Sequence, residues 1–298
     1  MRIARILTAS PRPLAMPAVY DGAGAAGDAV DVPAALGTAA GSGARHVTLG
    51  DGELLASPEL PTWVAAAKSA GFVRIELETS AVPLARPELA ARLRDLGVAG
   101  VAVPLFGADA DAHDWVVGQP GAMQRALRGI RAAHAAGLRV RVLAPVLRPT
   151  YRGLDQLVGR CLPLGVPAFT VVAPVTLPPG LLANPALAAP FVRRALALAS
   201  AARREVDVRG VPACLLAEQA LRGEAAGGPE CVVDARRPAS AFDNDSGDNA
   251  AAACESCRWR AHCAVPGPAL LAAFGEAGLQ ARSDAPPRRR TSRAGGGA

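Results

Sequence analysis

The stretch RHVTLGDGELLASPEL, residues 45–60, decides the predicted fold. Residues 47–49 are β-branched or apolar and predict a short buried strand. The turn Gly50-Asp51-Gly52 ends that strand, because two glycines allow a tight turn and a close approach of the backbone. Glu53 then stands at the carboxyl end of the strand, and Ser57 predicts the N-cap of a helix. Ligands of parallel α/β sheets and barrels bind at this end of the strands, although an ordinary βα turn has the same pattern.

The alternation of short apolar strands and helices continues along most of the chain. Glycines such as Gly97 and Gly137 follow the helical segments and predict where the helices end. Parallel βαβ topology follows from this order, so the expected fold class is α/β, a partial (β/α)6 TIM-like barrel. The predicted strands are 3–7, 47–49, 73–78, 98–103, 138–143, 168–173 and 206–208, and the predicted helices are 33–38, 58–70, 87–96, 122–136, 153–164, 185–204, 211–222 and 268–274.

The character of the sequence changes after residue 209. Residues 1–209 are expected to form the barrel and residues 210–282 a small cysteine-containing extension, with a polar loop at 241–249. Residues 283–298 are rich in proline, arginine and glycine, which predicts a disordered basic tail.

Composition limits the classes of function. The 298 residues carry a net charge of +6, but much of the excess lies in the arginine-rich tail, and Lys68 is the only lysine. Aromatic residues make up 4% of the chain, which argues against a nucleic-acid-binding platform. No run approaches the roughly 20 apolar residues of a membrane span, so we expect a cytoplasmic protein with neither membrane nor nucleic acid as a partner. Its six cysteines are then expected to be thiols or metal ligands rather than disulfides.

Three cysteines within ten residues form the sharpest chemical signal. Cys254, Cys257 and Cys263 follow the spacing C-x2-C-x5-C, so their thiolates can turn toward one ion or cluster. All-sulfur coordination suits zinc or an iron–sulfur cluster. Cys214 or Cys231 could supply a fourth ligand; the alternative is a set of scattered buried thiols. Cys161 lies in a predicted helix and is interpreted as a core thiol.

Other polar residues leave two interpretations each. Glu53 could hold a ligand's amino group by a charge-assisted hydrogen bond, or it could be a solvated carboxylate at a helix entry. The adjacent pair His113-Asp114 is interpreted as structural rather than catalytic. The acidic pair Glu76 and Glu78 and the basic pair Arg139 and Arg141 alternate along two strands, so each pair faces either the barrel interior or solvent.

Three pieces of the chain together resemble the radical SAM family. The first is LGDGELLASPEL, which is similar to the family's glycine–glycine–glutamate turn, with Asp51 in place of the first glycine and Leu54 in place of the usual proline. The second, residues 97–150, resembles the family's middle segment. The third comprises VPACLL, CESCRWRAHCAVPG and LLAAFGEAG, which resemble the C-terminal extension of members with an auxiliary iron–sulfur cluster.

The resemblance implies specific site residues. The turn residues Gly50, Asp51, Gly52 and Glu53 would contact the amino group of S-adenosylmethionine, and Cys214, Cys254, Cys257 and Cys263 would hold an auxiliary 4Fe-4S cluster. Family members also carry three cysteines near the first strand, whose cluster cleaves S-adenosylmethionine. The corresponding loop here is TASPRPLAMPAVYDG, and no cysteine precedes Cys161. The residues therefore favour the fold and argue against the radical chemistry.

Three functional hypotheses follow. The first is a degenerate radical SAM homologue that binds a cluster through its C-terminal cysteines and acts as a partner or substrate-binding component in peptide or natural-product modification. Its partner would be a complete radical SAM enzyme or a peptide substrate. The second is an active radical SAM enzyme with an atypical cluster site. The third is a non-enzymatic binding protein in which zinc or a cluster staples the C-terminal segment.

Overall fold

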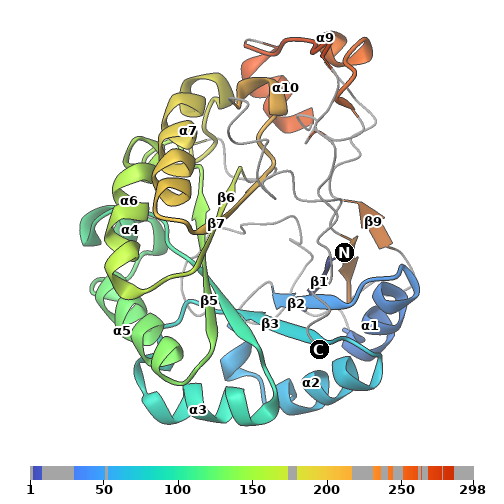
Figure 1. Ribbon diagram of the computed structural model, residues 1–298, viewed down its shortest axis with the longest axis vertical. Coiled ribbons are helices and arrows are strands. Elements are labelled where there is room, and N and C mark those ends of the chain that lie inside the picture. The colour runs from blue at the N-terminus through green and yellow to red at the C-terminus, as the bar shows by residue number, and fades with distance from the viewer. Residues whose placement is uncertain are drawn as a thin grey trace, which may run out of the picture.

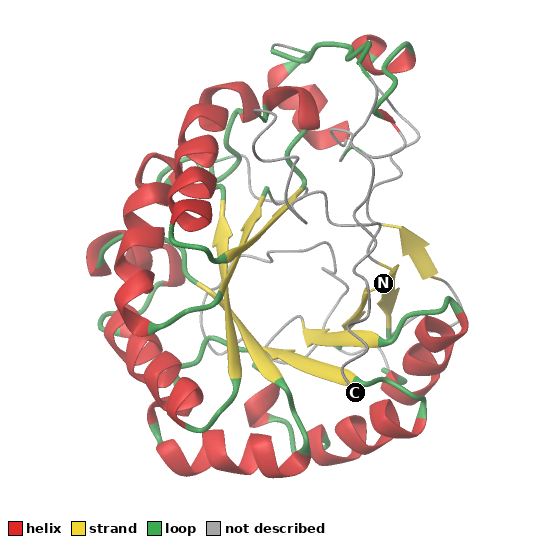
Figure 2. Cartoon of the chain, viewed as in Figure 1, coloured by secondary structure: helices red, strands yellow, loops and turns green. Residues whose placement is uncertain are grey.

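The computed structural model describes residues 3–8, 30–50, 53–173, 180–216, 231–235, 241–243, 251–260, 263, 268–276 and 278–284. These residues form one nine-stranded sheet with the order β7-β6-β5-β4-β3-β2-β1-β8-β9. The strands curve around a common interior, and the helices lie outside them (Figures 1 and 2). The strands are β1 Ile3–Leu7, β2 His46–Gly50, β3 Arg74–Glu78, β4 Gly100–Pro104, β5 Arg139–Pro145, β6 Ala168–Val172, β7 Glu205–Arg209, β8 Cys231–Asp234 and β9 Ala241–Asp243.

Six βα units follow one another in chain order before β7, which confirms the predicted α/β partial barrel. Two helices, α4 and α5, follow β4, and α4 was not predicted. Among the described helices, none is both long and apolar enough to cross a membrane. The helices are α1 Val32–Gly41, α2 Leu60–Ser69, α3 Pro87–Leu96, α4 Ala110–Val117, α5 Ala122–Ala135, α6 Leu154–Cys161, α7 Pro185–Ala201, α9 Ala252–Glu255 and α10 Pro268–Phe274.

The region predicted to be an extension contributes two strands to the sheet. β8 pairs with β1 in parallel, and β9 pairs with β8 in antiparallel register. Part of the loop expected at residues 241–249 is therefore a strand. Within the described residues no pairing joins β7 to β9, so the sheet is an open barrel. Sequence reasoning missed these strands because each is only three or four residues long and its pairing partner is distant in the chain.

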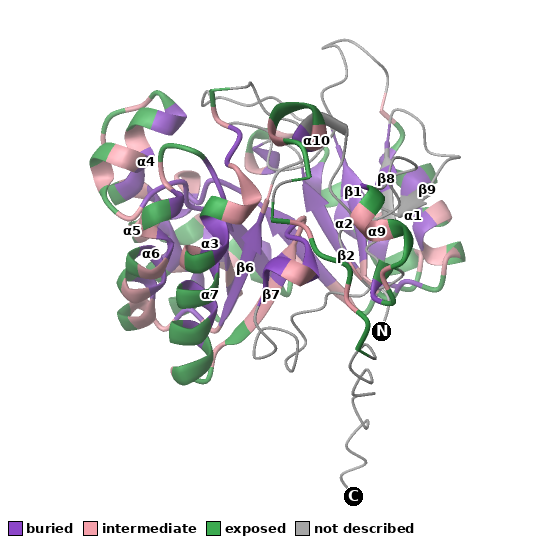
Figure 3. Cartoon of the chain, turned by 90° about the horizontal axis from the view of Figure 1, so that it is seen from above, coloured by how far each residue is buried: buried purple, intermediate pink, exposed green. Residues whose placement is uncertain are grey.

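Alternation along the strands divides the residues between two environments. Residues such as Val47, Leu49, Ile75 and Leu77 are buried with the apolar faces of the helices in one large core. The intervening residues face the concave side of the sheet, because successive side chains of a strand point to opposite faces. Figure 3 shows the buried strands enclosed by helices whose exposed residues lie on the outside. The concave face is thus free to carry polar side chains.

Several predicted helix boundaries differ from those in the structure, and two of the differences have a clear physical cause. Ser57 is not the N-cap of α2: its hydroxyl accepts from Glu59 N at 3.3 Å, and the helix begins at Leu60, with which Trp63 and Val64 enter the core. The first residue of α2 is thus determined by burial of the apolar face of the helix and not by an N-cap side chain. The helix predicted at 211–222 begins as a 3-10 turn at Ala213–Leu215. Ala213 N and Leu215 O have tertiary partners, Cys263 Sγ and Arg193 Nη1, and residues 217–222 lie outside the described part.

Candidate functional site

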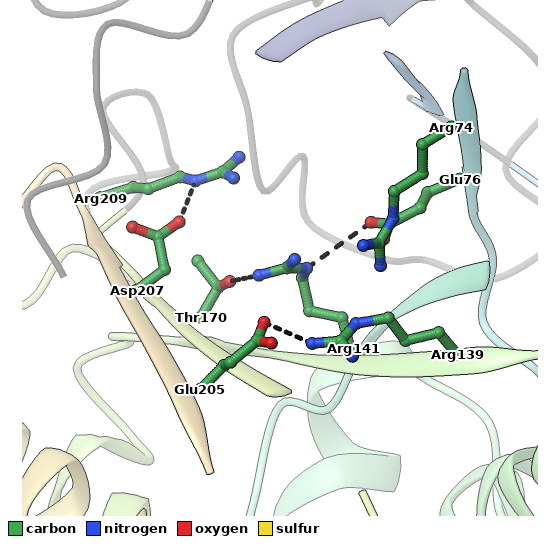
Figure 4. Close-up of polar contacts among 8 residues, drawn as sticks. All are labelled: Arg74, Glu76, Arg139, Arg141, Thr170, Glu205, Asp207 and Arg209. Carbon is green, nitrogen blue, oxygen red and sulfur yellow. Dashed lines mark hydrogen bonds and ion pairs between the residues drawn. The ribbon is translucent and has the colours of Figure 1, made fainter. Parts of the chain in front are cut away.

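Polar side chains from β3, β5 and β6 meet on the concave face of the sheet (Figure 4). Glu76 Oε1 accepts hydrogen bonds from Arg74 Nε at 2.9 Å and Nη2 at 2.6 Å. Arg141 Nε lies 3.6 Å from Glu76 Oε2, and Arg141 Nη1 donates to Thr170 Oγ1 at 3.4 Å. Glu76 and Arg141 therefore face the barrel interior, and the alternative of solvent-exposed charges is wrong for both.

The same pattern continues on β7. Arg139 forms an ion pair with Glu205, and Arg209 Nε donates to Asp207 Oδ2 at 2.8 Å. Asp207 Oδ1 is buried and has no hydrogen-bond partner among the described residues. Opposite charges thus alternate across the interior, so it offers both donors and acceptors to a polar ligand.

A buried ion pair joins β1 to β3 on the interior face of the sheet. Arg5 is 1% exposed, and its Nη2 contacts Glu78 Oε2 from β3. Gly50 packs directly on this pair, because a Cβ there would lie 2.8 Å from Arg5 Nη2. The Gly50 carbonyl accepts from Thr8 N at 2.9 Å and from Thr8 Oγ1 at 2.8 Å. The predicted turn thus begins at the ion pair, whereas Asp51 and Gly52 lie outside the described residues, and their contact with a cofactor stays a prediction.

Glu53 is buried at the carboxyl end of β2 and is held by the end of β3. Its Oε1 accepts from Thr79 Oγ1 at 2.6 Å, and its Oε2 accepts from Ser80 N at 3.0 Å and Ser80 Oγ at 2.5 Å. Burial raises the pKa of the Glu53 carboxyl, and the hydrogen bonds from Ser80 and Thr79 oppose that rise. The interpretation of Glu53 as a solvated carboxylate is therefore wrong. Whether it also contacts a ligand's amino group stays a prediction.

The turn that holds Glu53 is itself tightly constrained. Ala81 is fully buried and has a φ of +59°, in the left-handed region that favours glycine. Gly129 of α5 packs against it, because a Cβ at Gly129 would lie 1.9 Å from Ala81 O. Sequence reasoning missed Thr79 and Ser80, although two hydroxyl residues at the end of a predicted barrel strand were the available signal.

The pair His113-Asp114 has the structural role that the sequence predicted. His113 is buried and its Nδ1 accepts from Phe106 N at 3.1 Å, which fixes the loop after β4. Asp114 accepts from Gly121 N at 2.5 Å and Met123 N at 2.8 Å, at the start of α5. Burial lowers the pKa of His113 to about 4, so the imidazole is neutral at pH 7 and free to accept this hydrogen bond.

His113 is expected to make the folded state sensitive to acid. In the unfolded chain His113 binds a proton below its ordinary pKa of 6.5, whereas in the folded chain it stays neutral down to about pH 4. The free energy of unfolding should therefore fall by about 3 kcal/mol as the pH falls through this window. His113→Asn keeps an acceptor near the same position without a titration, so urea unfolding between pH 4 and 7 should show a flatter profile. An unchanged slope in the variant would contradict this assignment.

The described C-terminal cysteines gather around one short loop. Trp259 and Ala213 are buried together, and Cys257 and Cys263 pack against them. Cys263 Sγ accepts a hydrogen bond from Ala213 N at 3.1 Å, and Cys257 N donates to Cys254 O at 3.3 Å. The chain around Cys214, distant in sequence, is thus held beside the C-x2-C-x5-C loop.

The thiols are close enough to influence one another. Burial raises the pKa of Cys263 to about 12, and Cys214, Cys254 and Cys257 add to the rise. Burial likewise raises the pKa of Cys254, with contributions from Cys214 and Cys257. Even so, the described residues contain no group of three or more His, Cys, Asp or Glu arranged to hold a metal ion. The ligand set therefore stays a prediction.

The other two cysteines lie elsewhere in the fold. Cys161 is fully buried on α6 in the main core, and burial raises the pKa of its thiol to about 12, which confirms the predicted core thiol. Cys231 begins β8, next to β1, and its side chain lies outside the described part.

Part of the chain is similar in sequence to known proteins. Residues 22–156 match the Radical SAM superfamily. The AdoMet-dependent heme synthase of Methanosarcina barkeri is 30% identical over 123 residues, 41% of this chain and 35% of that protein. The enzyme of the same name from Nitratidesulfovibrio vulgaris is 30% identical over 88 residues, 30% of this chain and 24% of its own length. The chain thus aligns with about a third or less of these relatives.

Solved structures share the fold at low sequence identity. Native anSMEcpe with bound AdoMet superimposes with a TM-score of 0.61 and 12% identity, and the match covers 93% of this chain and 92% of that one. Streptococcus suis SuiB bound to precursor peptide SuiA gives a TM-score of 0.54 at 12% identity, over 79% of this chain and 58% of that one. The sequence match confirms the predicted resemblance of residues 22–156 to the Radical SAM superfamily, and the solved structures show that the barrel fold is shared.

Proposed function

We propose that this chain is a degenerate radical SAM protein that holds an iron–sulfur cluster in its C-terminal cysteines and lacks a SAM-cleaving cluster of its own. It acts as a substrate-binding component or partner in peptide modification. One observation carries this proposal: the segment between β1 and α1, where the family resemblance places the cleaving cluster, contains no cysteine. Iron–sulfur clusters need thiolate ligands, so the residues present do not fit that group, and no radical step is derived from it.

The C-terminal cysteines do fit a cluster by their chemistry. Cys214, Cys254, Cys257 and Cys263 would hold it as an all-sulfur donor set, and the packing of Cys257 and Cys263 against Trp259 and Ala213 supports this assignment. The backbone donor at Ala213 already satisfies Cys263 Sγ, as hydrogen bonds do for the sulfurs of iron–sulfur clusters. When bound, the cluster would supply a one-electron redox centre. A bound cation would also reverse the raised thiol pKa values, because coordination favours the thiolate.

The barrel interior is suited to a polar, extended substrate. Its concave face carries paired charges from β3, β5 and β7 and the hydroxyl of Thr170 from β6, and Glu53 adds a buried carboxylate at the carboxyl ends of the strands. A peptide offers amide donors and acceptors that match such a face. Streptococcus suis SuiB, which shares the fold, has a crystal structure in which it is bound to precursor peptide SuiA. We therefore propose a peptide as the substrate class. We also propose that Gly50, Asp51, Gly52 and Glu53 would be the residues that contact S-adenosylmethionine.

Metal analysis after anaerobic purification tests the proposal. We expect about four iron atoms and four sulfides per chain, the content of one 4Fe-4S cluster. Cys257→Ala should remove them, whereas the matched control Cys161→Ala should leave the iron content unchanged because Cys161 lies in the core. About eight irons, or formation of 5′-deoxyadenosine, would contradict the loss of the cleaving cluster. Zinc without iron would instead favour a non-enzymatic binding protein in which the metal only stabilises the C-terminal segment.

A further inference from the structure

We propose that Glu276 and residues 278–284, here called the clasp, hold the cysteine loop in place and control how tightly it retains an iron–sulfur cluster. The clasp follows α10 and returns to the loop that carries Cys254 and Cys257 (Figure 1). This inference rests on the proposed function, because it concerns the group that those cysteines would bind.

The centre of the clasp is Arg282. Its backbone N–H donates to Cys257 Sγ at 3.3 Å, so the clasp contacts a predicted ligand atom directly. Arg258 N in turn donates to Arg282 O at 3.0 Å, so a backbone hydrogen bond also joins the two segments. Hydrogen bonds to the cysteine sulfurs are among the contacts by which proteins tune iron–sulfur clusters, so this contact joins the clasp to the predicted cluster site.

Side chains of the clasp pack on the indole ring of Trp259, which lies beside Cys257. The Arg282 guanidinium lies 4.3 Å from the centroid of the Trp259 ring, and Trp259 Nε1 donates to Asp284 O at 3.0 Å. Arg282 and Asp284 are joined by two hydrogen bonds of 2.9 and 3.0 Å, which hold the guanidinium in place over the ring. Trp259 is 3% exposed and packs beside Cys257, so the stack excludes water from this side of the site.

The other end of the clasp is anchored independently. Glu276 accepts hydrogen bonds from Ala252 N at 2.7 Å and Ala253 N at 3.3 Å, just before Cys254. Both cysteines of the C-x2-C pair are thus flanked by clasp contacts. Residues around metal ligands commonly change metal affinity by 10- to 100-fold, which sets the size of the effect expected here.

Two variants separate the contributions of Arg282. Arg282→Ala removes the guanidinium and keeps the backbone N–H, whereas Arg282→Pro also removes the N–H that reaches Cys257. In reconstituted iron–sulfur protein, Arg282→Ala should release iron to a chelator about tenfold faster than the original chain, and Arg282→Pro faster still. Gln280→Ala is the matched control, since Gln280 is exposed in the same segment. In the apo protein, alkylation of Cys257, followed by mass spectrometry, should be faster in Arg282→Ala.

The outcomes distinguish the clasp from the proposed function. Release and alkylation rates equal to those of the original chain in Arg282→Ala and Arg282→Pro would overturn the clasp, provided that Cys257→Ser still loses iron. If the original chain and Cys257→Ser carry the same amount of iron, the proposed function fails and the clasp fails with it. If Arg282→Pro does not fold, the rate of Cys257 alkylation in Arg282→Ala is sufficient to test the clasp.

Discussion

Replacing Arg5 with methionine is expected to lower the free energy of unfolding by about 3–5 kcal/mol. Arg5 is 1% exposed on β1 and forms an ion pair with the Glu78 carboxylate, whose side chain is 8% exposed. Methionine fills similar space but leaves Glu78 as a buried charge without this partner. Removing one member of such a pair costs more than the pair contributes, because the remaining charge has lost both water and its counter-ion.

Urea unfolding of three variants measures this effect. The double variant Arg5→Met/Glu78→Leu should recover most of the loss, since replacing both charges removes the desolvation cost. Arg94→Met is the matched control: Arg94 also pairs with a carboxylate, Asp95, but their side chains are 54% and 66% exposed. That control should change the free energy of unfolding by less than about 1 kcal/mol. A double variant no more stable than Arg5→Met would refute this account of the pair.

Gly129→Ala is expected to lower the free energy of unfolding by about 3 kcal/mol. The added Cβ would lie 1.9 Å from Ala81 O and 2.8 Å from Ala81 C, so backbone rather than a flexible side chain must move. Ala81 is itself buried at a φ of +59° and has little freedom to adjust. Displacing this turn would also disturb Thr79 and Ser80, which hold Glu53.

The same substitution elsewhere provides the control for Gly129. Gly37 lies within α1, is exposed and has no atom within 4 Å of its would-be Cβ. Gly37→Ala should raise the free energy of unfolding by about 0.5–1 kcal/mol, because alanine favours the helix and restricts the unfolded chain. Thermal and urea unfolding of both variants test the contrast. Equal stability of Gly129→Ala and the original chain would show that α5 does not press on the turn.

Most of the barrel was predictable from local pattern. The helix Pro87–Leu96 and the helix Pro268–Phe274 begin and end where the sequence predicted. Gly97 terminates the first of these in the left-handed conformation that its position suggested. Apolar strands between such helices leave few topologies, because parallel strands need long crossovers and the crossovers have one hand. The α/β class with parallel strands therefore followed from periodicity and glycine placement, and the family resemblance supported the partial barrel.

The candidate site was predictable only in part. The residue types and their order indicated Glu53 and the C-terminal cysteines, and His113-Asp114 was interpreted correctly as structural. The partners Thr79, Ser80 and Arg282 were missed. Each of them is adjacent to its partner only after the chain folds, since 26 or 27 residues separate Glu53 from Thr79 and Ser80, and 25 separate Cys257 from Arg282.

The order of residues was enough to establish an α/β barrel, a cysteine-rich C-terminal segment and the lack of thiols between the first strand and first helix. These features depend on local periodicity and on residue chemistry, which neighbours in sequence carry. Packing alone established that Arg5 neutralises Glu78, that Ala81 is pressed by Gly129, and that β8 joins the sheet beside β1. Such pairings depend on distances between segments far apart in the chain, and burial makes each of them costly to lose.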